Sequence, residues 1–331
     1  MKISKGKFVF FLIMTILFTA FSIFALVYYF GEIYRPFFSK ATAEFEVPGL
    51  SEGFVPQGLA YEQNSNTFLV SGYMANGSPS RVYAISDDSV KYITLLDGET
   101  PYLEHAGGVA SDGEGVWIVG DGKVNYIKLQ TLLNAENGAE IEIDSTFSAP
   151  NGADFVTIYN NKLLVGEFYR SGNYERDDSH KIETTNGLNT AVTFAYTINN
   201  SAECGIDATP DYAISTTSLV QGMVVTGDKI ILSTSYSLPS STLLAYDNII
   251  DSENYITHTF GGFGANKDEE IELKTYILDQ ATSEKTLPPM SEEITIKDDK
   301  LYILFENACS KYKMFTRLNL TNVYSYGLEN L

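Results

Sequence analysis

Polar residues that could bind a ligand recur along the chain at the starts of short apolar segments. Two of them, Asp154 and Glu292, are carboxylic acids, and two carboxylates in one pocket can hold a cation or act as general acid and general base. Amide and imidazole groups stand at similar positions, in Gln57, His105 and Gln221. Because these residues are far apart in the sequence, they can share chemistry only if the fold brings the starts of the segments together.

Each of these residues also has a structural interpretation. Gln57 and Gln221 can cap the starts of strands by bonding backbone groups, and His105 can be a structural histidine. A water-filled channel tolerates carboxylates such as Asp154 and Glu292. The sequence contains neither an HExxH zinc motif nor a GxSxG nucleophile motif, so it does not indicate the hydrolase classes that use them.

The apolar segments form an internal repeat. Each has a polar or glycine start, a short apolar stretch, a tight turn of Asn, Asp or Gly, and a second apolar stretch, which is typical of a β-hairpin. The five hairpin segments are 56–73, 106–122, 153–169, 220–236 and 291–307. Candidate third strands follow at 80–86, 122–129, 190–198, 242–250 and 313–320, and candidate fourth strands at 90–96, 139–147, 211–216 and 273–279.

Four-stranded units repeated along a chain are typical of a β-propeller. Matching starts of the hairpin segments are separated by 50, 47, 67 and 71 residues, whereas a blade requires roughly 40–45 residues. Two units therefore contain a blade plus an insertion. The sequence predicts an all-β fold, a β-propeller with five blades, and six blades remain an alternative. The last unit lacks a clear fourth strand, so we expect residues 43–49 to supply it and close the ring.

In a propeller, the starts of the first strands and the ends of the second strands surround one mouth of the central channel. We therefore expect a ligand site there, and we expect the insertion 169–188, which carries Arg176 and His180, to fold over it as a lid. Aromatic side chains in this ring can stack on sugar rings or simply pack. The predicted ligand-binding residues are Gln57, Tyr73, His105, Glu167, Tyr169, Gln221, Tyr236 and Glu306, and the predicted catalytic residues, if the protein is an enzyme, are Asp154 and Glu292.

The N-terminus predicts a membrane segment. Residues 1–7 contain three lysines and residues 8–30 are uncharged, long enough as a helix to cross a hydrocarbon core of about 30 Å. A cleaved signal peptide is the alternative, but this run is longer than a signal peptide requires and ends in bulky aromatic residues. We expect a single-pass protein of the cell membrane with residues 1–7 in the cytoplasm, a tether at 31–43 and an extracellular domain at 44–331.

The charge of the external part is strongly acidic. Residues 31–331 carry 42 acidic and 19 basic residues, a net charge of −23. Such a surface repels phosphate backbones, which excludes nucleic acid as a partner. It can attract cations or a basic partner, or it can simply keep the domain soluble.

The two cysteines give a geometric test of the strand assignment. Cys204 lies between a third and a fourth strand and Cys309 follows a second strand, so the assignment places them on opposite faces. A strand spans about 17–20 Å, whereas a disulfide requires Cα atoms within about 7 Å. We therefore predict that they are unpaired.

Several motifs resemble known propellers. The run of "VPQGLAY", "HAGGVA" and "PSRVYAI" is similar to uncharacterised secreted bacterial propeller proteins over most of residues 45–330, a resemblance that implies no activity. A more remote similarity is to the gluconolactonase-like calcium-dependent hydrolases, in which acidic and amide oxygens at three inner-strand starts hold the metal. This resemblance implies Asn151, in "PNG", as a ligand-binding residue and calcium as a candidate cofactor. Gln57 and Gln221 stand where that family has carboxylates, and Ca²⁺ favours charged oxygen ligands.

Two functions follow from these expectations. The first is a membrane-anchored binding module that holds a glycan, a peptide or a small molecule at the channel mouth. The alternative is a cation-dependent hydrolase of lactones, phosphoesters or glycosides that uses Asp154 and Glu292. Three or more carboxylates within metal-coordination reach would favour the enzyme, whereas a ring dominated by Gln57, Gln221 and tyrosines would favour binding. A partner-docking scaffold is a third class, which an exposed apolar patch would indicate.

Overall fold

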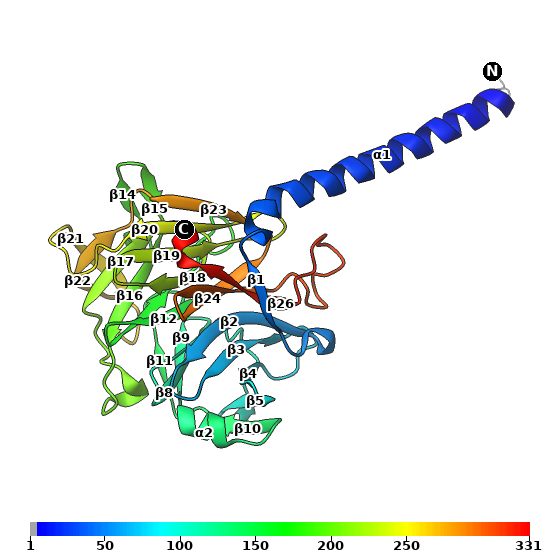
Figure 1. Cartoon of the computed structure of the whole chain (residues 1–331). Coiled ribbons are helices and arrows are strands. Elements are labelled where there is room, and N and C mark those ends of the chain that lie inside the picture. The colour runs from blue at the N-terminus through cyan, green and yellow to red at the C-terminus, as the bar shows by residue number, and fades with distance from the viewer. Residues whose placement is uncertain (1–4) are drawn as a thin grey trace.

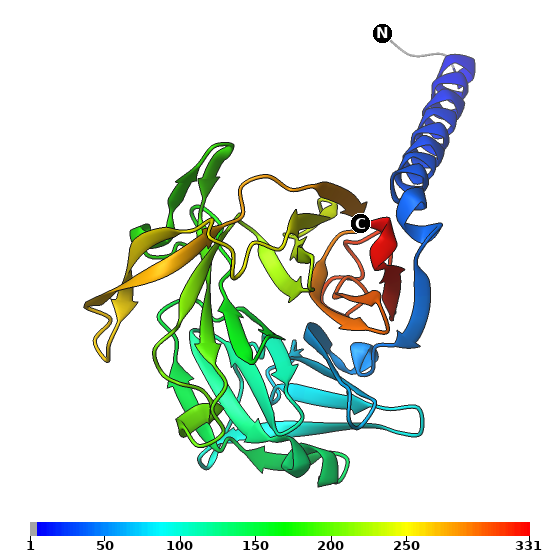
Figure 2. The ribbon, with the colours of Figure 1, turned by 60° about the vertical axis from the view of Figure 1, so that its left-hand side comes forward.

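Each of the five repeated segments forms a β-hairpin in the computed structural model, which describes residues 5–331. The hairpins supply the two inner strands of five sheets set around a central channel (Figures 1 and 2). The predicted all-β, five-bladed propeller is confirmed. The inner pairs are β2 (Phe54–Glu62) with β3 (Thr67–Met74), β7 (Gly108–Ser111) with β8 (Gly115–Gly120), β12 (Phe155–Tyr159) with β13 (Lys162–Gly166), β18 (Val220–Val225) with β19 (Lys229–Thr234), and β24 (Ser291–Lys297) with β25 (Lys300–Phe305).

Two further strands complete each blade. They pair antiparallel with the inner strands and with each other, so that every blade is a meander of four strands. From blade 1 to blade 5 the third and fourth strands are β4 (Arg81–Ile85) and β5 (Val90–Asp97), β9 (Lys123–Lys128) and β11 (Ser145–Ser148), β16 (Ala191–Thr197) and β17 (Tyr212–Thr216), β20 (Ser241–Asp247) and β23 (Ser283–Leu287), and β26 (Asn322–Gly327) and β1 (Thr42–Glu46).

The N-terminal strand closes the ring. β1 pairs antiparallel with β26, with Thr42 opposite Ser325 and Glu46 opposite Asn322. It is the outermost strand of blade 5, as expected for residues 43–49. Pairing the start of the domain with its end removes an exposed sheet edge and joins the first and last blades.

Three strand assignments from the sequence were wrong. The segment 139–147 is divided: β10 (Ala139–Glu142) extends blade 1 parallel to β5, and only β11 belongs to blade 2. The segment 273–279 belongs to β22 (Glu269–Ile277), which pairs with β21 (Ile256–Phe263) and runs parallel to β17, so it widens blade 3 instead of completing blade 4. The segment 313–320 is a loop, because β26 takes the third place in blade 5.

The remaining regular elements lie in the connections between strands. The helix α2 (Leu129–Asn134) packs its buried leucines, Leu129 and Leu132, into the core between blades 1 and 2. Short strands are β6 (Thr100–Pro101) on blade 1 and the hairpin of β14 (Ile182–Thr184) with β15 (Gly187–Asn189), and single turns of 3₁₀ helix are Leu50–Glu52, Asp178–His180, Glu203–Gly205 and Leu328–Asn330.

A buried glutamate occupies the centre of the channel. Glu293, on β24, accepts hydrogen bonds from the backbone amides of Leu59 (2.7 Å), Val109 (3.0 Å) and Val156 (3.0 Å). A Cβ atom on Gly222 of β18 would lie 2.7 Å from the Glu293 backbone, so glycine is required for this approach. Burial raises the pKa of Glu293 to about 8, although the three amide donors lower it. One side chain of blade 5 thus joins the inner strands of blades 1, 2 and 3.

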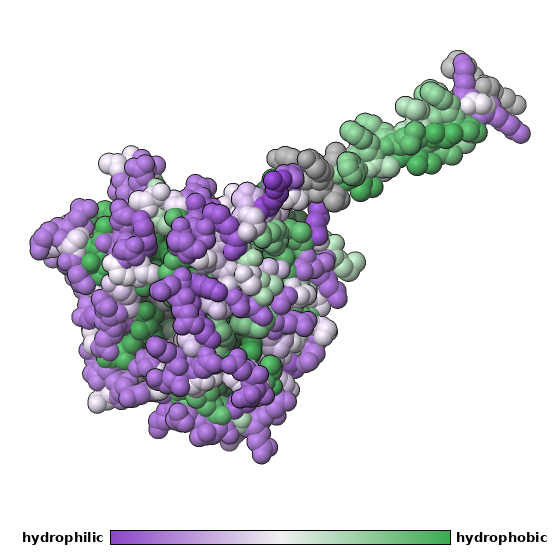
Figure 3. Space-filling model, in the orientation of Figure 1, coloured by the Kyte–Doolittle hydropathy of each residue, from purple (hydrophilic) through white to green (hydrophobic). Residues whose placement is uncertain are grey.

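The C-terminal end of the N-terminal helix packs against the propeller. The helix α1 (Lys5–Phe38) contains a stretch, Lys5–Phe24, that is long and apolar enough to cross a membrane, and its apolar surface projects from a mostly hydrophilic domain (Figure 3). The helix continues through most of the segment expected to be a tether. Tyr34 and Phe37 are buried: the Tyr34 hydroxyl lies 2.8 Å from Ser240 Oγ, and the Phe37 ring stacks on that of Tyr326. Residues 1–4 of the expected cytoplasmic tail lie outside the described residues.

The two cysteines are unpaired and lie in different parts of the core. Cys204 packs between blades 2 and 3, where its carbonyl accepts a hydrogen bond from Trp117 Nε1. Cys309 packs between blades 5 and 1. This separation agrees with the strand assignment.

Candidate functional site

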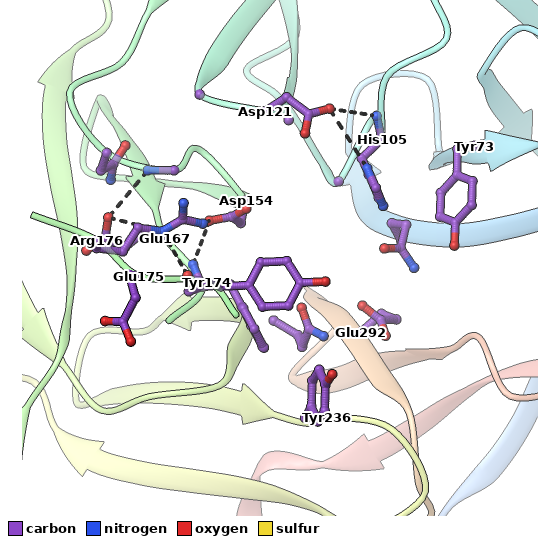
Figure 4. A pocket seen from close by; sticks show the side chains of 18 of the residues that line it. Tyr73, His105, Asp121, Asp154, Glu167, Tyr174, Glu175, Arg176, Tyr236 and Glu292 are labelled. Atoms are coloured by element: carbon purple, nitrogen blue, oxygen red, sulfur yellow. Dashed lines mark hydrogen bonds and ion pairs between the residues drawn. The ribbon is translucent and has the colours of Figure 1, made fainter. Parts of the chain in front are cut away.

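A cavity of about 1050 Å³ opens at the mouth of the channel where the inner strands begin. We call this end of the propeller the mouth face. All five blades contribute side chains to the cavity (Figure 4). The lining includes ten of the residues expected from the sequence: Gln57, Tyr73, His105, Asn151, Asp154, Glu167, Gln221, Tyr236, Glu292 and Glu306. Tyr169 is buried and does not line the cavity; the Lys181 ammonium lies 5.7 Å from its ring centre.

Irregularities in the inner strands aim three of these side chains at the cavity. The pairing of β2 with β3 skips from Pro56 to Gly58, which leaves Gln57 as an extra residue, and the pairing of β18 with β19 skips Gln221 in the same way. The start of β24 contains a third shift, at Glu292. A β-bulge turns a side chain out of the alternating pattern of the strand. Three of the five polar starts, at Gln57, Gln221 and Glu292, therefore have a common structural cause.

An ion pair fixes one wall of the cavity. Asp154 Oδ2 lies 2.6 Å from Arg176 Nη2 and accepts a hydrogen bond from the Phe168 amide at 2.7 Å. Arg176 Nε also donates to the Phe168 carbonyl at 2.9 Å. Burial raises the pKa of Asp154 to about 6, and the Arg176 guanidinium opposes this rise. Because Arg176 belongs to the insertion 169–188, the ion pair holds that insertion against the mouth.

A histidine–glutamate pair lies beside this ion pair. His180 Nδ1 lies 2.8 Å from Glu167 Oε1, and both side chains are buried. The same carboxylate oxygen accepts a hydrogen bond from the Val192 amide at 3.0 Å. A carboxylate on Nδ1 orients the imidazole and leaves Nε2 as the remaining polar atom, and His180 Nε2 has no hydrogen-bond partner among the described residues.

Two acids share a proton on the opposite wall. Burial and the nearby Glu306 carboxylate raise the pKa of Glu292 well above its usual range, so Glu292 is the protonated partner and donates a hydrogen bond to Glu306. Burial raises the pKa of Glu306 to about 7, against the lowering effects of the Lys311 ammonium and of Gln57 Nε2, which donates to it at 2.9 Å. Like charges in contact do not both ionise, so at most one of the two acids carries a negative charge near neutral pH.

A lysine closes this part of the cavity. Lys311 Nζ lies 2.5 Å from the Tyr73 hydroxyl and 4.9 Å from the ring centres of both Tyr73 and Tyr312. Such a position is favourable for an ammonium group because the ring faces are negative. The Tyr73 ring also packs on the imidazole of His105, at 4.7 Å between centres.

Aromatic rings form the rim next to blades 3 and 4. Tyr174, from the insertion 169–188, packs edge-on against Phe168 at 5.3 Å, and Tyr236 lies 6.2 Å from the same ring. The Arg170 guanidinium stacks over Tyr236 at 4.1 Å. The insertion thus covers one side of the mouth, as expected for residues 169–188.

The cavity does not gather a metal-binding cluster. Among residues 5–331, no group of three or more His, Cys, Asp and Glu side chains is arranged to hold a metal ion. Asn151, which the resemblance implied as a ligand-binding residue, lines the cavity and donates through Nδ2 to the carbonyls of Val165 (2.9 Å) and Val192 (3.3 Å).

No family model matches the sequence, and no curated protein matches it closely. Among solved structures, the glutaminyl cyclase of Myxococcus xanthus is 12% identical, with 86% of this chain and 94% of that chain covered at a TM-score of 0.41. A gluconolactonase of Xanthomonas campestris is 10% identical, with 87% and 93% covered at 0.37. The WD40 β-propeller domain of Doa1 is 8% identical, with 87% and 96% covered at 0.36. Similarities this low say nothing about the activity of the present chain.

Sequence reasoning missed several residues of the site. Lys311 and Tyr312 follow the end of β25 by only a few residues. Because the ends of the second strands were predicted to lie at the channel mouth, this short distance in the sequence could have indicated them. Arg176 and His180 were placed in the covering insertion, but their partners, Asp154 and Glu167, were not assigned. No local signal pairs them, because the contacts depend on the path of the insertion.

Proposed function

We propose that this protein is anchored in the cell membrane by α1 and binds a ligand at the channel mouth of an extracellular propeller. The ligand class is a glycan, a peptide or another small molecule. The observation that carries the proposal is the cavity, to which all five blades contribute. Its volume of about 1050 Å³ lies at the upper end of the range of about 300–1,000 Å³ that is usual for small-molecule sites.

The chemistry of the lining favours a ligand recognised through hydrogen bonds and ring contacts. Asp154 and Glu167 are already paired with Arg176 and His180, so they do not require a metal or a charged ligand for neutralisation. Gln221 lines the cavity and makes no side-chain hydrogen bond to another described residue. The charged groups of this wall are already neutralised by one another, and the remaining groups that point into the cavity are amides and tyrosines. Such a lining is typical of sites that bind polar ligands.

The anchoring proposal is supported by α1 and by the charge that precedes it. The apolar stretch Lys5–Phe24 spans 20 residues, and the three lysines of residues 1–7 favour a cytoplasmic N-terminus. The contacts of Tyr34 and Phe37 with the propeller fix the end of this helix to the domain, which keeps the binding site close to the membrane.

Binding can be tested on the full chain in nanodiscs by saturation-transfer NMR. Three separate panels, of neutral oligosaccharides, short peptides and small metabolites, identify the class of ligand. We expect one class to give saturation transfer that Gln221→Ala and Tyr236→Ala reduce. Asn64→Ala is the matched control, because Asn64 lies at the opposite end of the channel. Absence of binding in all three panels, or binding that is insensitive to both mouth variants, contradicts the proposal.

A hydrolase is the second candidate, and one observation favours it. Glu306 and Asp154 have pKa values of about 7 and about 6, which suit general acid–base chemistry near neutral pH. This candidate requires a cation. Calcium at 100 times its dissociation constant would raise the free energy of unfolding by about 2.7 kcal/mol. This gain can be measured as a difference in unfolding temperature between samples with calcium and samples with a chelator. A calcium-dependent shift that Asp154→Asn with Glu292→Gln abolishes supports the hydrolase, and an unchanged transition supports the binding module.

A further inference from the structure

The loop between β25 and β26 carries the most exposed apolar residues of the propeller. We call residues 307–321 the mouth loop. Met314 is 86% exposed and Phe315 is 70% exposed, more than any other large apolar side chain described outside α1. Exposed apolar side chains that lie together are candidates for contact with a partner or a membrane.

The mouth loop is ordered by its own hydrogen bonds. Asn307 is buried, donates to the Pro289 carbonyl at 2.9 Å and accepts from the Leu320 amide at 2.8 Å. Thr316 Oγ1 donates to the Asn307 carbonyl at 2.9 Å. The base of the loop is therefore fixed, and the exposed Phe315 near its tip also lies at the edge of the cavity.

The charge of the mouth loop is opposite to that of the rest of the domain. It contains Lys311, Lys313 and Arg317 and no acidic residue, whereas residues 31–331 as a whole carry a net charge of −23. Basic residues that flank exposed apolar ones are typical of protein segments that bind the interface of an anionic membrane. An acidic partner surface would match the charges but would leave the apolar tip unexplained.

The mouth loop and α1 leave the same side of the domain. Figure 1 shows both projecting from one side of the propeller. The Tyr34 hydroxyl of α1 contacts Ser240 in the loop between β19 and β20, and that loop also belongs to the mouth face. The end of α1 therefore lies next to the mouth face of the domain.

We propose that the mouth loop docks on the membrane surface, with Met314 and Phe315 in the interface and Lys313 and Arg317 at anionic lipid headgroups. The proposal rests on the proposed anchoring by α1. Docking turns the cavity mouth toward the bilayer, so the ligand reaches the site from the membrane surface. The same loop carries Lys311 to the Tyr73 hydroxyl, which links the docked segment to the cavity wall.

Trp fluorescence of the full chain in vesicles tests the proposal. The chain has a single tryptophan, the buried Trp117, which contributes a common background. Phe315→Trp places a reporter at the tip. Val90→Trp is the matched control, because Val90 is 57% exposed and follows the turn between β4 and β5 at the opposite face. We expect brominated lipid to quench the first variant about twofold more strongly than the second, since bromine quenches only tryptophans that reach the interface.

The composition of the vesicles and a flotation assay separate the outcomes. We expect Lys313→Glu with Arg317→Glu to reduce quenching of the Phe315→Trp variant in anionic vesicles. Equal quenching of the Phe315→Trp and Val90→Trp variants in chains that float with the vesicles overturns docking while leaving anchoring by α1 intact. Chains that do not float contradict both proposals. The tryptophan emission of the Phe315→Trp variant could change with the amount of protein per vesicle and not with the lipid composition. That result would show that a second copy of the chain covers the loop tip, and it would also overturn docking.

Discussion

The Glu293 carboxylate accepts a hydrogen bond from the backbone amide of Val109 at 3.0 Å, which joins blade 5 to blade 2 across the channel. The same side chain reaches the amides of Leu59 and Val156 in blades 1 and 3. These donors lie on β2, β7 and β12, the innermost strands of their blades, whose inner edges have no neighbouring strand in the same sheet. A single acceptor thereby satisfies three buried amides and also positions the strands that carry the cavity residues.

Removal of this side chain is expected to destabilise the whole propeller. Glu293→Ala leaves three buried amides without an acceptor, and each unsatisfied group costs about 1–3 kcal/mol. We expect a loss of several kcal/mol in the free energy of unfolding, measured by urea denaturation of the full chain in detergent. Glu44→Ala is the control, because the Glu44 carboxylate makes a peripheral hydrogen bond to Ser325 on the outer edge of blade 5. An equal effect of the two substitutions would contradict a central role.

The stability of the protein should also depend on pH through Glu293. Its pKa of about 8 in the folded state lies above the ordinary value near 4.3, so the folded state binds the proton more tightly. This contribution is fully present below pH 4 and is lost as pH rises toward 8, at most about 5 kcal/mol. Glu293→Gln removes the titration. We expect the wild-type chain to lose more stability than this variant between pH 5 and pH 8 in urea denaturation; parallel profiles would show that Glu293 does not titrate in this range.

The general architecture could be predicted because each hairpin carries its own pattern. Alternating apolar residues, turn residues and polar starts recur locally, and the number of blades follows from their spacing. The positions of Gln57 and Gln221 in the cavity followed as well, since all inner strands start at one end of the channel. These inferences required no knowledge of which strands pair at a distance.

The errors arose where pairing is decided by tertiary contacts. The apolar pattern of 273–279 is that of a strand, but the sequence does not state that it runs parallel to β17 of the preceding blade. Glu293 was missed for a related reason. Strict alternation allows only one of Glu292 and Glu293 to face inward, and the register shift at the start of β24 allows the first to reach the cavity and the second to reach the channel.

The ion pair between Asp154 and Arg176 should control the order of the covering insertion. Arg176→Met breaks the 2.6 Å contact and the bond to the Phe168 carbonyl, and removal of the guanidinium moves the pKa of Asp154 further above its usual range. We expect faster hydrogen exchange of residues 170–180, measured by mass spectrometry, and a loss of about 1–3 kcal/mol in stability.

Two variants control this experiment. Asp154→Asn in the Arg176→Met background removes the unpaired buried acid, and we expect it to restore part of the lost stability without restoring slow exchange. Arg170→Met removes a neighbouring cation that stacks on Tyr236 but does not contact Asp154. If Arg170→Met accelerated exchange as much as Arg176→Met, the ion pair would not be the cause.

The positive charge of Lys311 should lower the apparent pKa of the Glu292–Glu306 pair. Its ammonium lowers the pKa of Glu306, which is about 7 in the intact site. Lys311→Met removes that effect, so we expect the apparent pKa of the Glu292–Glu306 pair to rise. The measurement is a pH titration of ¹³C-labelled glutamate carboxyl signals, with Glu306→Gln used for assignment, and the values belong to the pair because the two groups share a proton. Lys313→Met serves as the control on the same loop. An unchanged or lower midpoint in Lys311→Met, or an equal shift in Lys313→Met, would mean that Glu306 titrates independently of the Lys311 ammonium.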